Sequence, residues 1–168
     1  MRTRDVLAFL KNELEQIDPP IGRVFAQLRK SADPQAMITD FRFKDPVFGN
    51  IIKAFIIQPG NARIRRATTG RNGHSHRLRN ITIQGFISLR EGNEDDGEDL
   101  ALEDTFDAII GRLQQVQRLE TQSQGSTFHK GEMDMTPITP ARISNHNVLV
   151  AELTTVIEDR ILGVAVAP

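Results

Sequence analysis

Two apolar segments on either side of a charged connection constrain the fold of this chain most. The first, residues 51–57, reads Ile-Ile-Lys-Ala-Phe-Ile-Ile and is apolar at nearly every position. The second, residues 81–89, alternates apolar and polar side chains, with Gly85 interrupting the apolar set. A short run that is apolar on both faces predicts a covered, central strand, and strict alternation predicts a half-buried strand. We therefore predict two long strands of one sheet, and we interpret Gly85 as a β-bulge.

The connection between these strands contains no acidic residue from Gly60 to Arg79 and is rich in arginine. Turn residues at 59–61 and glycines near the middle predict an extended hairpin over about residues 58–80, with Ile64 pointing inward. Arginines on such a hairpin are candidates for binding an acidic neighbour or a phosphate backbone. The candidate residues are Arg63, Arg65, Arg66, Arg71, Arg77 and Arg79.

An almost purely acidic loop, residues 91–99, follows the second strand and leads into an amphipathic helix that ends near Leu119. The hydrophobic period changes there from 2 to 3.6, and acids suit the positive N-terminal end of a helix. We expect this loop to be a subunit-interface surface, carried by Glu94, Asp95, Asp96, Glu98 and Asp99.

The remaining pattern predicts a helix at 5–17, a short strand at 21–28, a helical turn from Pro34, a loop at 45–50 and strands at 133–138 and 148–157. Pro137 and Pro140 restrict the strand at 133–138 to a sheet edge. The predicted fold class is α+β, an antiparallel or mixed β-sheet packed on one side by helices, in one domain spanning residues 1–168. The expected core comprises Ile52, Ala54, Ile56, Ile81, Ile83, Phe106, Ile110 and Leu113.

Composition excludes several classes of function. The 168 residues carry a formal net charge of -1, which argues against a general nucleic-acid binder. The chain has no cysteine, so thiolate metal sites and a cysteine nucleophile are excluded. No apolar stretch approaches the roughly 20 residues of a membrane span, and the N-terminal segment lacks the features of a signal peptide. We expect a soluble, intracellular protein.

Candidate catalytic and metal sites are weak. The acidic run that begins at Glu91 lacks the spacing of a calcium loop, and His74 and His76 have no third ligand at a fixed distance in the sequence. His129 and His146 belong to no motif that would complete a Ser-His-Asp triad. We therefore expect no enzyme, no metal and no cofactor. The alternative hypothesis among enzymes is a small enzyme with an acidic metal site.

With its elements in this order, the chain resembles the tail terminator proteins of long-tailed bacteriophages, relatives of the lambda-type minor tail protein. The resemblance covers nearly the whole chain, and residues 147–156 look like that family's final strand. It implies a homohexameric ring that caps the tail tube, with the tail tube protein and a head-completion or connector protein as partners. It also implies a location in the tail or neck of the virion, and in the host cytoplasm during assembly. No membrane and no catalytic residue are implied.

Two further hypotheses remain open at this point. The arginine hairpin could instead define a nucleic-acid-binding module, although no aromatic residue is interleaved for base stacking. The chain could also be another neck or head-completion protein. Within a ring, the arginines would either pair with the acidic loop of a neighbour or face the channel and touch the end of the genomic DNA. The apolar tail at 161–168 would then supply the apolar contacts.

Overall fold

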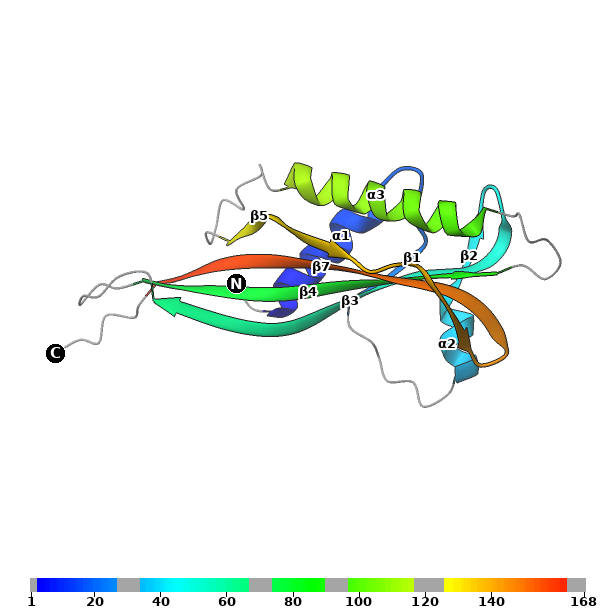
Figure 1. Ribbon diagram of the computed structural model, residues 1–168, viewed down its shortest axis with the longest axis horizontal. Helices are drawn as coiled ribbons and strands as arrows, with labels where there is room; N and C mark the ends of the chain where they lie inside the picture. The colour runs from blue at the N-terminus through cyan, green and yellow to red at the C-terminus, as the bar shows by residue number, and fades with distance from the viewer. Residues whose placement is uncertain (1–2, 27–33, 67–73, 90–96, 117–125, 163–168) are drawn as a thin grey trace.

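The computed structural model describes residues 3–26, 34–66, 74–89, 97–116 and 126–162, which form a mixed seven-stranded sheet with helices against it (Figure 1). The helices are α1 (Thr3–Glu15), α2 (Pro34–Phe41) and α3 (Glu98–Val116). The strands are β1 (Arg23–Ala26), β2 (Arg42–Asp45), β3 (Gly49–Arg66), β4 (His74–Ser88), β5 (Ser126–Met135), β6 (Thr139–Ile143) and β7 (His146–Leu162). The predicted α+β class with a mixed sheet is confirmed.

Three long strands, β3, β4 and β7, form the middle of the sheet, in the order β1-β3-β4-β7-β5. Short strands occupy both sides of this group, because β1 and β2 pair with the outer edge of β3 while β5 and β6 pair with β7. Only β1 runs parallel to its neighbour among the described pairs. The predicted strand at 51–57 thus has a partner strand along each edge and is central in the sheet, as expected.

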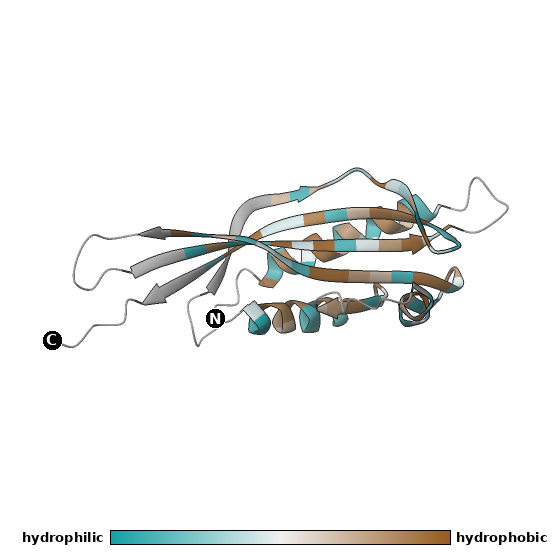
Figure 2. Ribbon diagram, turned by 90° about the horizontal axis from the view of Figure 1, so that it is seen from below, coloured by the Kyte–Doolittle hydropathy of each residue, from teal (hydrophilic) through white to brown (hydrophobic). Residues whose placement is uncertain are grey.

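The helices lie on both faces of the sheet, so the expected packing on one side is wrong. The larger apolar cluster joins α1 and α3 to one face of the sheet and includes Phe55, Ile57 and Ile83. A second cluster joins α2 to the other face and includes Ile52, Ala54 and Ile56. The reason is the double-sided apolar character of β3, which needs a cover on each face. Figure 2 shows hydrophobic residues along the strands where the helices lie against them.

The expected core is correct in most of its members but not in their arrangement. Ile52, Ala54 and Ile56 are buried under α2, whereas we expected them to pack against the stripe of α3. Phe106 of α3 instead meets Phe55 edge-to-face, with ring centroids 5.6 Å apart. Ile110 is only partly buried at the margin of this cluster. Alternation along β3 explains the difference, because neighbouring side chains point to opposite faces.

Gly85 is not a bulge, because the pairing of β4 with β3 and with β7 continues through it without a shift. A Cβ atom built at this position would lie 2.7 Å from the ring of Phe55 and 2.8 Å from that of Phe106. Glycine is therefore required here because it leaves room for the edge-to-face aromatic pair.

The irregularity in the ladder lies instead in β3, between Pro59 and Ala62. Pro59 pairs with Ile81 while Ala62 pairs with Arg79, so β3 contains one extra residue there. The extra residue reverses which side chains of β3 point to which face. Ile64, which we expected to point inward, consequently lies opposite Arg77 on the face that carries α1, yet it is 66% exposed because the strands extend past the helices there.

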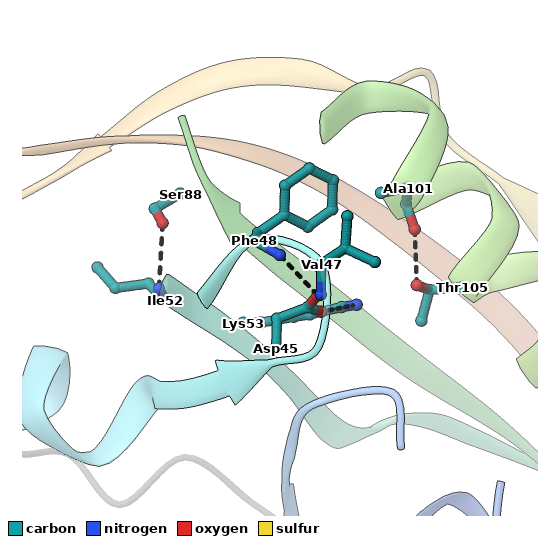
Figure 3. A network of polar contacts seen from close by, with 8 residues as sticks. All are labelled: Asp45, Val47, Phe48, Ile52, Lys53, Ser88, Ala101 and Thr105. Carbon is teal, nitrogen blue, oxygen red and sulfur yellow. Dashed lines mark hydrogen bonds and ion pairs between the residues drawn. The ribbon is translucent and has the colours of Figure 1, made fainter. Parts of the chain in front are cut away.

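The predicted loop at 45–50 is a β-hairpin, because residues 42–45 form a strand that we did not predict (Figure 3). Asp45 organises the turn: its Oδ1 accepts the N–H groups of Val47 (2.9 Å) and Phe48 (3.1 Å), and its Oδ2 accepts from Lys53 Nζ at 2.9 Å. Burial acts to raise the pKa of the Asp45 carboxyl, but the hydrogen bonds from Lys53, Val47 and Phe48 together hold it below the usual value.

The C-terminal part of the sheet differs in extent from the prediction. Of the expected edge strand at 133–138, residues 133–135 belong to β5 and residues 136–138 lie between β5 and β6. Pro140 lies within β6 at the outer edge of β7, where a missing N–H is tolerated. The last strand continues beyond the expected end at 157, so Ile161 and Leu162 pair with Ser75 and His74. Residues 163–168 of the predicted tail lie outside the described residues.

Candidate functional site

The predicted hairpin is part of an arm of three long strands, which we define as residues 62–66 of β3, 74–79 of β4 and 157–162 of β7. Residues 126–128 of β5 pair with residues 157–159 at the base of this arm. It begins beyond the bulge and extends past the helices to one end of the molecule (Figure 1). The outer edge of β3 pairs with β2 and β1 only as far as Ile57. Along the arm this edge has no partner strand among the described residues, so its backbone groups are open to another chain.

The predicted arginines divide into three groups. Arg63 is exposed on the arm, and Arg77 is half-buried opposite Ile64. Arg79 is only 3% exposed and donates a hydrogen bond from Nη1 to Thr3 Oγ1 of α1, so it belongs to the interior and not to a contact surface. Arg65 and Arg66 pair within the β3–β4 ladder, but their side chains, together with Arg71, lie outside the described residues.

Arg63 and Arg77 do not share a face of the arm. Arg63 lies opposite Leu78 in the β3–β4 ladder, so these two side chains share one face. Arg77 comes directly before Leu78 in β4 and therefore points to the other face. Arg79, two residues further along, points to that same face and contacts α1 there. The arm thus presents positive charge on both faces instead of a single basic surface.

The described part of the predicted acidic surface lies on α3. Glu98 is buried, and Glu94, Asp95 and Asp96 lie outside the described residues, which leaves Asp99 exposed from the predicted set. Sequence reasoning missed the continuation of this surface along the helix. Its exposed members are Asp99, Glu103, Asp104 and Asp107, which we call the acidic face of α3. The spacing of four residues between 99, 103 and 107 was the signal available in the sequence.

An exposed leucine lies within the acidic face. Leu100 is 62% exposed, and Glu103 and Asp104 follow it at the distances of three and four residues that make neighbours on a helix surface. None of the four carboxylates forms an ion pair with any residue in the described ranges. The start of α3 and the arm lie at opposite ends of the molecule (Figure 1).

A second basic surface, which the sequence did not reveal, lies at the β1/β2 edge of the sheet. A groove of about 680 Å³ is formed there by α1, β1, α2 and β2, and we call it the edge groove. Its charged lining residues are Lys11, Glu15, Arg23, Asp40, Arg42 and Lys44. Lys11 pairs with Glu15 at 3.6 Å, whereas Arg42 and Lys44 form no ion pair within the described part of the chain. Val24, Phe25 and Phe43 add an apolar lining.

Binding of a metal finds no support in the described residues, where no three His, Asp or Glu side chains are grouped to hold an ion. Among the histidines considered as metal ligands or catalytic residues, His146 lines a polar pocket with Asn50, Asn145 and Asn147. The side chains of His74, His76 and His129 lie outside the described residues. In the same ranges, no helix is long and apolar enough to cross a membrane.

Comparison with known proteins adds no assignment, since no protein-family model and no curated protein matches the chain. The likeness to tail terminator proteins therefore depends on the order of the elements, and the function that it implies enters below as a proposal.

Proposed function

We propose that this protein is a structural, non-enzymatic subunit of a ring that caps the tail tube of a long-tailed bacteriophage. The ring ends tail elongation and offers a surface to the head-completion or connector protein. The observation that carries the proposal is the arm, in which three strands extend beyond the helices with Ile64 exposed. Such an extension stabilises a monomer little, whereas it suits a subunit that meets neighbours or the tube.

The open edge of β3 supports a role in assembly. Beyond Ile57 this edge has no strand partner among the described residues, and an unpaired edge is a template for another chain. Arg63 on this edge and the bulge before it are features by which soluble proteins prevent uncontrolled edge pairing. The edge therefore combines availability for one specific partner with protection against aggregation.

The separation of charge supports a ring. A head-to-tail contact uses two different surfaces of each subunit and closes into a ring when the rotation between subunits allows it. Positive surfaces lie on the arm and in the edge groove, while the acidic face of α3 forms a separate surface. Complementary potentials of this kind set the register between subunits. Where the arm reaches the channel, Arg63 and Arg77 would meet the phosphates of the DNA end.

Electron microscopy of the purified chain, alone and mixed with tail tubes, tests the proposal. We expect rings of constant subunit number and their attachment to one end of the tubes. Particles that remain monomeric at high concentration and never bind tube ends would contradict it.

The alternative of a nucleic-acid-binding module makes a different prediction. Its supporting observation is the exposure of Arg63 on an arm whose connecting sequence has no acid. A module of this kind should bind DNA or RNA at physiological salt, with an affinity that falls steeply as salt rises. Fluorescence anisotropy with a labelled oligonucleotide separates the two functions, since a ring subunit alone should show no such affinity.

A further inference from the structure

The acidic face of α3 has no compensating cation among the residues that the structure describes. Asp99, Glu103 and Asp107 repeat at four-residue spacing, and like charges at this spacing destabilise a helix. Only Asp99, in the first turn, benefits from the helix dipole. Since the described residues supply no cation to this face, a cationic partner would relieve the repulsion.

The acidic face also contains an exposed apolar side chain. Leu100, 62% exposed, lies among the carboxylates and faces away from the buried stripe of Leu102, Phe106 and Ile109. Interfaces combine an apolar core with a polar rim, and Leu100 with the carboxylates beside it offers both kinds of contact.

The edge groove has the complementary composition. Arg23, Arg42 and Lys44 are exposed at its rim, and the Nε of Arg23 donates to the carbonyl oxygen of Arg42 at 3.3 Å. This bond connects the starts of β1 and β2, which follow each other along the same edge of β3. Phe25 and Phe43 give the groove an apolar lining that suits a leucine side chain.

The two surfaces belong to different sides of the same molecule. α1 packs against β1 and β3, while α3 packs against α1, β4 and β7. The groove lies at the β1/β2 edge, and the acidic face of α3 lies on the side of that helix away from its buried stripe. Because different residues form the two surfaces, a contact made through the acidic face of one copy leaves the groove of that copy free.

We propose that copies of this chain associate head to tail, with Leu100 and the acidic face of α3 of one copy seated in the edge groove of the next. This inference deepens the proposed function, on which it rests for the closure of the contact into a ring. It assigns the contact between subunits to α3 and the groove, and it leaves the arm for the tube, the connector or the channel.

Two charge-reversal variants of the full chain test the contact. The first, Glu103→Lys with Asp107→Lys, makes the acidic face basic. The second, Arg42→Glu with Lys44→Glu, makes the rim of the groove acidic. All four side chains are exposed, so both variants should keep the fold, which circular dichroism checks. In sedimentation velocity each variant should self-associate about tenfold or more weakly than the natural chain.

Mixing the two variants supplies the decisive result. In an alternating assembly, the basic helix of the first variant meets the acidic groove of the second, and the natural helix of the second meets the natural groove of the first. Equimolar mixing should therefore restore association. The matched controls, Asp134→Lys on β5 and Arg142→Glu on β6, change exposed charges outside the contact and should leave association unchanged.

Failure of the contact is distinguishable from failure of the proposed function. Rings that persist in both charge-reversal variants would overturn the contact and leave the ring proposal standing. A natural chain that stays monomeric at every concentration would overturn the contact as well. Conversely, restoration on mixing, combined with assemblies that never bind tube ends, would establish the contact and refute the function.

Discussion

The same three strands, β3, β4 and β7, behave differently in the two halves of this molecule. Where helices cover them, Phe55, Ile57 and Ile83 are fully buried. Beyond the bulge the strands continue with the same pairing, yet Ile64 is largely exposed. Hydrogen bonding along the ladder is thus maintained in both halves, whereas burial depends on what lies over the sheet. The covered half supplies stability, whereas the arm adds exposed surface.

The largest effect expected from this comparison comes from truncation in the covered half. Phe106→Ala removes a fully buried ring that meets Phe55, and it should lower the free energy of unfolding by about 3–5 kcal/mol. Chemical denaturation measures the loss. An unchanged midpoint would mean that α3 does not belong to the core.

A smaller effect is expected at the closest approach between the sheet and α3. Gly85→Ala places a Cβ atom within 3 Å of two aromatic rings and should cost about 1–3 kcal/mol through overpacking. Thermal unfolding of this variant checks the prediction. Gly111→Ala is the matched control, because a Cβ atom there meets nothing within 4 Å.

The turn between β2 and β3 should show a dependence of stability on pH. The pKa of Asp45 is lower in the folded protein than its ordinary value of 3.8, so its stabilising contribution is complete above that value and is lost as the pH falls through the folded pKa. Asp45→Asn should therefore be less stable than the natural protein at neutral pH, with a difference that shrinks in acid. Denaturation at a series of pH values measures this difference, and a constant difference would contradict the assignment.

The smallest effect on stability is expected in the arm. Ile64→Ser should change the free energy of unfolding by less than about 0.5 kcal/mol, because the side chain is already exposed. The same change should weaken attachment to the tail tube if the arm meets the tube. A large loss of stability in the isolated chain would show that the arm is covered within the monomer and would end the distinction between the two halves.

The sequence by itself determined the long elements of this protein. The apolar run at 51–57 and the alternation at 81–89 became β3 and β4, and the 3.6-residue period became α3, because periodicity reports which side chains need burial. It also indicated the charge separation between the arginine-rich connection and the acids that precede α3. Short strands such as β2 carry too few side chains to give a period and were missed.

Only the tertiary structure decided which of these residues form a surface. One extra residue in β3 decided the face on which Ile64 lies, the extent of the helices left it exposed there, and packing of α1 buried Arg79. The edge groove gathers Lys11, Arg23 and Arg42 from three elements that are separate in the sequence. Local pattern determines how a segment folds, but the position of a side chain relative to other segments depends on long-range packing, and so the candidate surfaces emerged only from the folded chain.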